Sequence, residues 1–377
     1  MNDTRPTLSF FFELNGSLKN WDSVGFLSRE IALYNLLAKE YFEKIYFFTY
    51  GDQTDLKYKN LLEPNIIIIP LKQKPKSFLH AFLYELTLPI FRYSILKTCD
   101  IIKTNQNSGS IAAAITKLLF PKKIFIARSG YIGSELAKRE GLSIIVKAYY
   151  FISEHLSYHL ADKVLIPTKE NTDILIRKYP FLTKKIVTHN NHIDTELFRK
   201  DPTAEKKYDI IYVGRMSRDK NHRAILAIAK NTPLRILFIG DGPERESCIT
   251  DSKQSGISLT HLSSIPNNML PAYYNQSRIC VFPSLHEGNP KSLLEAMACE
   301  VPVIGFYVPG VKTIIQNEKN GILCNKKDLK EKTLSLLSNK SQIENLGKKA
   351  RETVLKGFSL EKILQREVRI YNSFFNL

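Results

Sequence analysis

Short apolar segments alternate with longer helix-like segments along most of this 377-residue chain, and that alternation restricts its fold more than any other feature. Helical patterns such as residues 111–119 and 142–160 separate most of the apolar segments. Buried strands that alternate with helices indicate parallel sheets covered on both faces. The strands expected in the first half are residues 8–13, 45–49, 65–70, 100–103, 124–127, 164–167 and 185–188.

The pattern lapses into a polar, irregular stretch at residues 190–207 and then starts again. A chain of this length exceeds one ordinary domain. We therefore expect two tandem Rossmann-like α/β domains, 1–190 and 191–359, each with a doubly wound parallel sheet, facing a central cleft. The apolar C-terminal helical segment, 360–377, is expected to join the first domain. The second series of strands comprises residues 209–213, 234–239, 258–262, 279–283, 301–306 and 321–324.

The composition is that of a soluble globular protein, with 44% hydrophobic and 24% charged residues. The formal net charge of +17 is spread over both halves. Solvated surface is one interpretation of this charge, and a basic face for a membrane or a polyanion is another. No nucleic-acid recognition motif accompanies the charge, so no nucleic-acid partner is expected.

Cysteine usage and hydropathy indicate a cytoplasmic location. The five cysteines form no CxxC pair, which is typical of buried thiols in a reducing compartment and argues against zinc. Residues 1–16 do not have the pattern of a signal peptide. The longest apolar run, residues 78–96, is interrupted by Glu85 and Arg92, so no membrane span is expected.

The stretch VFPSLHEGNPKSLLEAMACEVPVI, residues 281–304, carries the clearest chemical signal. A strand runs into a loop with Glu287, Gly288, Asn289 and Pro290, and then into a helix expected to hold Glu295 in its first turn. A helix N-terminus at the end of a parallel strand is an anion site, and the two carboxylates suit hydroxyl groups. The alternative is that Ser292-Leu-Leu-Glu295 is a capping box, in which Glu295 would only accept from the Ser292 backbone N–H.

Other strand-end loops carry cations and polar groups. GRMSRDKN, which follows the strand ending at residue 213, places Arg215 and Lys220 where they could hold a phosphate; a solvated basic loop is the alternative. The first domain offers a polar loop at residues 15–25 and strand-end residues near 105 and 128, for which ordinary loop polarity is an equal explanation. The chain has no Asp-x-Asp, P-loop, GxSxG or HExxH motif and no metal-like histidine spacing, so no metal is expected.

With these motifs in order, residues 185–360 resemble the group-1 glycosyltransferases, or glycosyltransferase family 4, a retaining family with the GT-B architecture. The resemblance is carried by NNHIDTELF, VGRMSRDKN, IGDGPERE, the Glu-x7-Glu run from residue 287, and PGVKTIIQNEKNGILC. The first half resembles the family only in its strand–helix alternation. In two places the chain departs from the family pattern: GNPKS replaces the common Gly-Phe-Gly-x-Pro, and Arg128-Ser129-Gly130 stands where many members have a histidine.

The resemblance implies a role for each matching residue. Arg215 and Lys220 would bind the donor diphosphate, Glu287 would contact the transferred sugar, and Glu295 would hold the ribose hydroxyls. The catalytic residues expected are Glu287, Arg215 and Lys220; the donor-binding residues expected are Glu295, Gly16, Gly214, Gly288, Asn289, Pro290, Lys291, Ser292 and Leu293; and those expected on the acceptor side are Asp22, Arg128 and Asn105.

The function implied is a retaining, metal-independent transfer of a hexose from a nucleoside-diphosphate sugar to a hydroxyl of a glycan or lipid-linked glycan. The expected setting is cell-surface polysaccharide, lipopolysaccharide or glycoconjugate biosynthesis. A nucleotide-sugar epimerase or hydrolase of the same architecture and a non-catalytic polyanion-binding protein are the alternatives. Residues 78–93 and 142–160, aromatic-rich and with basic neighbours, either pack into the core or lie on the anionic inner face of the cytoplasmic membrane.

Overall fold

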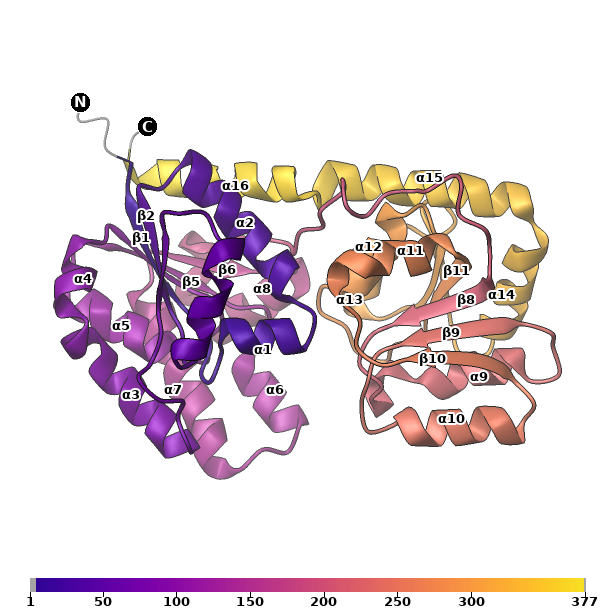
Figure 1. Cartoon of the computed structure of the whole chain (residues 1–377), viewed down its shortest axis with the longest axis horizontal. Helices are drawn as coiled ribbons and strands as arrows, with labels where there is room; N and C mark the ends of the chain where they lie inside the picture. The colour runs from indigo at the N-terminus through magenta and orange to yellow at the C-terminus, as the bar shows by residue number, and fades with distance from the viewer. Residues whose placement is uncertain (1–4, 376–377) are drawn as a thin grey trace. The chain divides into compact units, whose positions relative to one another are not determined.

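The computed structural model describes residues 5–375, so the ends of the predicted first domain, residues 1–4 and 376–377, lie outside the described residues. The chain forms two compact units (Figure 1). The first unit contains the residues up to His189 and those from Leu364 onward, and the second is Asn190–Ile363. The linker after residue 189 and the return of the chain near residue 364 are therefore the two crossings between units.

The first unit is built on a seven-stranded sheet in the order β3-β2-β1-β4-β5-β6-β7, with every described pair parallel. The strands are β1 Thr7–Phe11, β2 Lys44–Phe48, β3 Ile66–Ile69, β4 Ile101–Thr104, β5 Ile124–Arg128, β6 Lys163–Ile166 and β7 Ile186–Thr188. The helices are α1 Leu18–Ser23, α2 Leu27–Glu40, η1 Gln53–Leu61, α3 Phe78–Phe91, α4 Tyr93–Thr98, α5 Ser110–Leu119, α6 Gly133–Arg139, α7 Ile144–Leu160, α8 Lys169–Lys178 and η2 Pro180–Lys184.

The second unit is built on a six-stranded sheet in the order β10-β9-β8-β11-β12-β13, again parallel throughout the described pairs. The strands are β8 Tyr208–Val213, β9 Arg235–Ile239, β10 Ser258–Leu262, β11 Ser277–Phe282, β12 Val303–Phe306 and β13 Ile322–Cys324. The helices are η3 Arg218–Lys220, α9 His222–Ala229, α10 Arg245–Gln254, η4 Asn267–Met269, α11 Leu270–Asn275, α12 Lys291–Ala298, α13 Pro309–Lys312, α14 Leu329–Ser338 and α15 Lys340–Gly357. A last helix, α16 Leu360–Phe375, leads back to the first unit.

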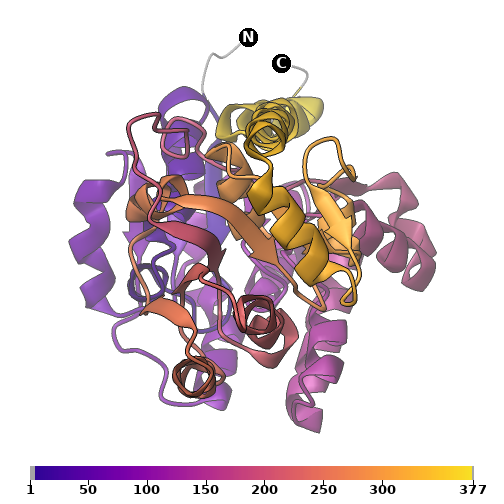
Figure 2. The same ribbon diagram turned by 90° about the vertical axis from the view of Figure 1, so that its right-hand side faces the viewer.

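Helices cover both faces of each sheet, as the apolar strands require. In the first unit, α5 contacts α3 and α7 on one face. In the second unit, α9 contacts α10 and α14, while α12 contacts α15 (Figure 2). Strand centres such as Ile211 and Ile236 are fully buried between these layers, which explains why they read as continuous apolar runs.

The helix α16 is fixed to the first unit by a buried ion pair. Lys103, on β4, donates from Nζ to Glu367 Oε1 over 2.6 Å and to the Tyr371 hydroxyl over 3.1 Å. Burial raises the pKa of Glu367, but the Lys103 ammonium outweighs it and brings the pKa down to about 2. Removing either partner would leave an uncompensated buried charge, so the C-terminal helix is an integral part of the first unit.

Each predicted strand overlaps one of β1–β13, but the stretch predicted as a polar loop at residues 15–25 is in part helical. The short helix α1 occupies Leu18–Ser23, and the Ser17 side chain caps it by accepting from the Asn20 N–H. Trp21 faces inward and stacks on Phe12 at a centroid distance of 4.4 Å. The capping serine and the single tryptophan were the signals for this helix.

Candidate functional site

The carboxyl-terminal edge of the second sheet brings together the loops that the sequence analysis selected. β8 ends at Val213, β11 at Phe282 and β12 at Phe306, and the loops after them contain residues 214–217, 283–290 and 307–308. Because all strands are parallel, these loops lie at the same edge, which is where open α/β sheets bind ligands.

Lys220 and Glu287 form an ion pair at this edge. Lys220 Nζ lies 2.6 Å from Glu287 Oε1, and their side chains are 21% and 8% exposed. The two loops are also joined through the backbone, because the Leu285 N–H donates to the Asp219 carbonyl over 2.8 Å. Two of the predicted catalytic residues, 67 positions apart in the chain, are thus in direct contact.

Arg215 differs from Lys220 in being exposed, and no described residue pairs with its guanidinium. It follows Gly214, whose φ of 154° favours glycine. A Cβ on the neighbouring Gly240 would lie 2.0 Å from the Gly214 carbonyl oxygen. The loops after β8 and β9 can therefore approach this closely only with a glycine at Gly240.

The loop Gly288–Asn289–Pro290 is fixed on two sides. The Asn191 N–H donates to Asn289 Oδ1 over 3.3 Å, and Asn191 Nδ2 donates to the Asn289 carbonyl over 3.0 Å. A Cβ on Gly310 would lie 2.0 Å from the Gly288 carbonyl oxygen. Asn289 Nδ2 is buried and has no hydrogen-bond partner among the described residues, so it is a donor available to a ligand.

The helix α12 begins at Lys291 with Pro290 as its N-cap, and no side chain caps it. Its first turn contains Lys291, Ser292 and Leu293, and the Leu293 side chain is fully buried. Leu293 can therefore serve a ligand only through its backbone N–H. An uncapped helix N-terminus with a lysine in its first turn suits an anion.

The prediction that Glu295 lies in the first turn of this helix is wrong. The helix starts at Lys291, so Glu295 lies in the second turn, and the capping-box alternative fails because Pro290, not Ser292, is the cap. The Glu295 carboxylate is buried and accepts from Asn267 Nδ2 over 3.0 Å and from the Tyr274 hydroxyl over 3.2 Å. In this structure Glu295 joins α12 to η4 and α11.

A second polar cluster lies at the carboxyl-terminal edge of the first sheet, around Glu13. Glu13 accepts from the Trp21 indole N–H over 3.2 Å and from the Asn105 side-chain amide. Arg128, at the end of β5, donates to the Asn105 carbonyl and side-chain oxygens over 3.0 and 3.1 Å. The structure thus brings together Arg128 and Asn105, and it adds Glu13, which the sequence analysis missed because it counted this residue as part of the first strand.

Two other predicted residues of the first unit have different surroundings. Asp22 is exposed and accepts from the Tyr58 hydroxyl over 2.7 Å, so it is bonded to η1 instead of to the Glu13 cluster. The Gly16 N–H donates to the Glu13 carbonyl over 2.7 Å, and the N-terminus of α1 is served by Asp55, which accepts from Leu18 and Lys19. An anion already occupies that helix N-terminus.

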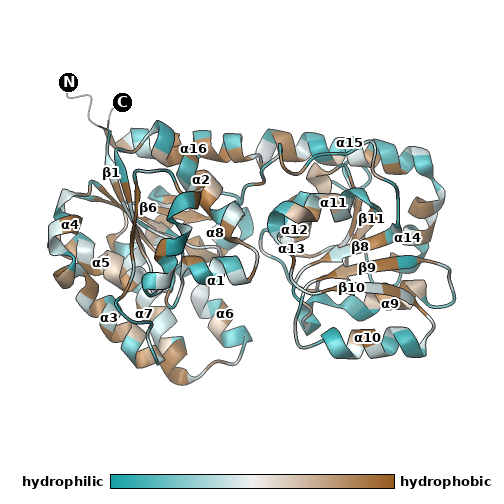
Figure 3. Cartoon of the chain, in the orientation of Figure 1, coloured by the Kyte–Doolittle hydropathy of each residue, from teal (hydrophilic) through white to brown (hydrophobic). Residues whose placement is uncertain are grey.

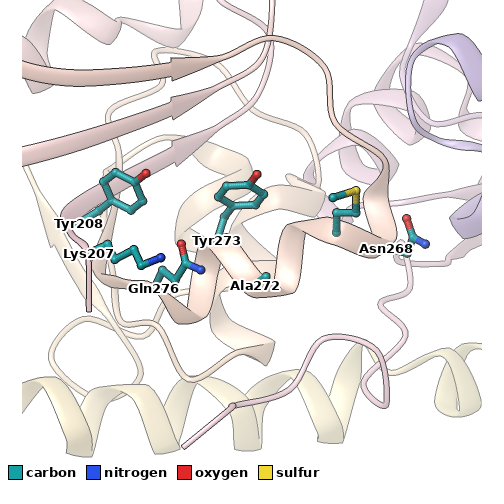
Figure 4. A pocket seen from close by; sticks show the side chains of 7 residues that line it. Lys207, Tyr208, Asn268, Ala272, Tyr273 and Gln276 are labelled. Atoms are coloured by element: carbon teal, nitrogen blue, oxygen red, sulfur yellow. The ribbon is translucent and has the colours of Figure 1, made fainter. Parts of the chain in front are cut away.

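A hollow of about 440 Å³ lies elsewhere, at the opposite edge of the second sheet (Figure 4). Lys207 and Tyr208, at the start of β8, line it together with Tyr273 and Gln276. None of the predicted site residues lines this hollow, and we do not assign the donor site to it.

Part of the chain matches a known protein family. Residues 194–353 match the family described as "Glycosyl transferases group 1". Residues 194–353 are therefore identified as a group-1 glycosyltransferase region. The matched range includes every predicted donor residue of the second unit.

Individual relatives agree with this family match. The chain is 28% identical over 294 residues to the capsular polysaccharide biosynthesis glycosyltransferase CapM of Staphylococcus aureus, covering 71% of this chain and 73% of CapM. Its fold is similar to that of sucrose-phosphate synthase from Thermosynechococcus elongatus, with a TM-score of 0.77, 20% identity, and 99% and 100% of the two chains covered. For Anabaena HepE, solved with UDP and glucose, the TM-score is 0.75 and the sequence identity is 14%, with 98% of this chain and 100% of HepE covered. These matches confirm the predicted class of two Rossmann-like parallel-sheet domains of the GT-B type.

Among residues 5–375, no group of three or more His, Cys, Asp or Glu side chains is arranged to hold a metal ion. No helix within the same range is both long and apolar enough to cross a bilayer.

Proposed function

We propose that this glycosyltransferase moves a hexose from a nucleoside-diphosphate sugar to a hydroxyl of a glycan or lipid-linked glycan, with retention at the anomeric carbon. The proposal is supported by the family match, by a relative named for capsular polysaccharide biosynthesis, and by a structural neighbour solved with UDP and glucose. We expect the reaction to take place in the cytoplasm.

The observation that carries the proposal is the 2.6 Å contact between Lys220 and Glu287. In a nucleotide sugar, the anomeric carbon is bonded directly to the oxygen of the outer phosphate. A cation for that phosphate and a carboxylate for the sugar hydroxyls must therefore lie within a few ångströms of each other. An ammonium–carboxylate pair has this spacing.

The surrounding groups suit a departing diphosphate. Arg215 and Lys220 would bind it with charge-assisted hydrogen bonds, and the N-terminus of α12 would add backbone donors from Ser292 and Leu293. Such fixed donors stabilise negative charge as it develops on the leaving group. Gly288, Asn289, Pro290 and Lys291 would shape the sugar side, where Asn289 Nδ2 is an available donor. Gly214 allows the turn that exposes Arg215.

Retention is proposed to follow from attack on the same face that the diphosphate leaves, with the phosphate accepting the proton of the incoming hydroxyl. This proposal needs no metal ion and no side chain as nucleophile. It assigns the hydroxyl-binding role on the acceptor side to the cluster of Glu13, Asn105 and Arg128 in the first unit.

The roles predicted for Glu295 and Gly16 stay predictions, because groups that would meet the donor already have hydrogen-bond partners. Ribose could reach Glu295 only if its hydroxyls replaced the Asn267 and Tyr274 donors that now surround the carboxylate. Gly16 would have to approach a diphosphate through a backbone whose N–H is already bonded to Glu13.

Ligand-induced thermal stabilisation tests the donor site. UDP, GDP and ADP should be compared with the corresponding monophosphates and nucleosides, and at least one diphosphate should raise the melting temperature of the wild-type protein. The Arg215→Ala/Lys220→Ala variant should lose this shift, whereas Lys253→Ala, an exposed lysine on α10, should keep it. If no nucleoside diphosphate stabilises the wild-type protein, the donor assignment is wrong. A panel of nucleotide sugars scored by hydrolysis then identifies the sugar, and NMR of the product's anomeric proton tests retention.

A further inference from the structure

The helices α3 and α7 lie against each other on one face of the first sheet (Figure 1). The rings of Phe78 and Phe82 on α3 meet the Tyr149 ring of α7 edge to face, at 5.3 and 6.0 Å between centroids. The Tyr149 hydroxyl donates to the buried Glu85 carboxylate over 2.9 Å. The inward side of α3 is therefore hydrogen-bonded to α7 through Glu85, and both helices also contact α5.

The outward sides of these two helices are apolar as well. On α3, exposed residues recur at helical spacing at Leu79, Leu83 and Ile90, and Ile90 is 66% exposed. On α7, Ile144 and Ile145 are 79% and 67% exposed. Figure 3 shows hydrophobic colouring along α3, whose only charged side chain points inward. We call this surface the α3–α7 face; it consists of Leu79, Leu83, Ile90, Phe91, Ile144, Ile145, Phe151 and Ile152.

The α3 side of this face is bordered by positive charge. Lys72, Lys74 and Lys76 are all exposed in the loop that leads into α3, and Arg92 and Lys97 follow its other end. Between residues 64 and 99 the only acidic residue is Glu85, which is fully buried. The exposed charge along this segment is therefore of one sign.

We propose that the α3–α7 face is a docking surface for an anionic lipid bilayer. Exposed large apolar side chains lose their contact with water when they enter the acyl boundary, while lysines at the rim meet anionic headgroups. The charge complementarity distinguishes a bilayer from an uncharged apolar partner. Each lysine near an anionic surface contributes about fivefold to partitioning, so the three that precede α3 contribute about a hundredfold together. This proposal does not depend on the identity of the donor.

Vesicle flotation with the full chain tests the proposal. The protein should float with vesicles of phosphatidylcholine containing phosphatidylglycerol, and it should remain at the bottom of the gradient with phosphatidylcholine alone. About 0.5 M NaCl should weaken the binding, because added salt screens the lysine–headgroup attraction.

Matched variants locate the surface. Lys72→Gln/Lys74→Gln/Lys76→Gln should lower the partition coefficient about a hundredfold, whereas Lys340→Gln/Lys348→Gln/Lys356→Gln, three exposed lysines on α15, should leave it nearly unchanged. Ile144→Ser/Ile145→Ser should lower it at least tenfold, whereas Leu56→Ser/Leu61→Ser, two exposed leucines on η1, should not. Equal melting temperatures would verify that each variant is folded.

Three outcomes would overturn the proposal: no flotation with anionic vesicles, equal losses in the α15 and α3-loop variants, or a concentration-dependent dimer that Ile144→Ser/Ile145→Ser abolishes. The last outcome would assign the face to a second copy of the chain. Donor stabilisation by a nucleoside diphosphate is measured without lipid, so a failure here is distinguishable from a failure of the proposed function.

Discussion

Lys220 Nζ and Glu287 Oε1 lie 2.6 Å apart, although Lys220 ends the short helix η3 after β8 and Glu287 lies in the loop after β11. The Glu287 side chain is nearly buried, and its position is further fixed because the Gly310 N–H donates to the Glu287 carbonyl over 3.2 Å. A cation and a carboxylate held together in this way form one functional unit, and changes to either should affect the other.

Replacing Glu287 by Gln should separate catalysis from stability. We expect kcat to fall by about a hundredfold or more, because the amide lacks the charge proposed to bind the sugar hydroxyls. The Lys220 side chain keeps contact with water, at 21% exposed, so the free energy of unfolding should change by only about 1 kcal/mol. Initial rates and chemical denaturation measure the two effects. Lys200→Met breaks the comparable 3.0 Å pair with Glu300 in the same unit and should leave kcat unchanged; a similar loss of activity there would argue against a special role for Glu287.

Gly310 supports the Glu287 loop through close backbone packing. A Cβ at this position would lie 2.0 Å from the Gly288 carbonyl oxygen and 2.6 Å from that of Glu287. Gly310→Ala should therefore displace the loop, cost about 1–3 kcal/mol of stability and lower kcat at least tenfold. Gly357→Ala is the control, since nothing lies within 4 Å of its Cβ position. Wild-type activity in Gly310→Ala would mean that the loop position is not critical.

The strands were predictable because each combines an apolar run with a polar or glycine-bearing exit, and buried parallel strands need little else. The start of α12 was harder to predict. Pro290, which lacks an N–H, serves as the N-cap, and this moves Glu295 from the first turn to the second. A serine followed by a glutamate three residues later suggested a cap that the chain does not form.

The contacts of the site could not be read from the sequence, because they join distant residues. The resemblance to a family supplied roles for Lys220 and Glu287, but their pairing depends on the strand order β8-β11. Glu13 was missed for a local reason: β1 ends at Phe11, two residues earlier than the apolar run suggested, so Glu13 belongs to the loop.

Variants of Glu13 and Asp22 test which residues of the first unit bind the acceptor. Glu13→Gln would replace the carboxylate that Trp21 and Asn105 share, and we expect transfer to the acceptor to fall at least tenfold. Stabilisation by the nucleoside diphosphate should be unchanged, since Glu13 belongs to the other unit. Asp22→Asn should retain transfer, because Asp22 bonds to Tyr58 instead. The reverse result, with Asp22 essential and Glu13 dispensable, would favour the predicted role of Asp22 over the role proposed for Glu13.

Glu85 should make the protein less stable as the pH rises. Burial raises the pKa of Glu85 from its ordinary value of 4.5 to about 7, although its hydrogen bonds from Tyr149 and Ile111 oppose this. The folded state then binds the proton more tightly than the unfolded state, so its contribution to stability falls between pH 4.5 and 7. The difference between these two pKa values corresponds to about 3 kcal/mol of unfolding free energy. Glu85→Gln should flatten this dependence in denaturation curves measured across the range; an unchanged pH profile would contradict it.

His222 should have the opposite dependence, in the other unit. Its ring is buried edge to face against Tyr212 and Phe238, at 4.5 and 5.4 Å, and neither ring nitrogen has a partner among the described residues. Burial lowers the pKa of His222 from 6.5 to about 4, so the unfolded state binds the proton first and stability falls as the pH drops through that interval. His222→Phe keeps an aromatic ring there and should protect the second unit at pH 5, with little change at pH 8.

Because Glu85 and His222 lie in different units, fluorescence or hydrogen exchange that resolves the two units should show the first gaining and the second losing stability as the pH falls from 7 to 5. If both units respond in the same direction in the wild-type protein and in both variants, other groups dominate the pH dependence, and the assignments to Glu85 and His222 are wrong.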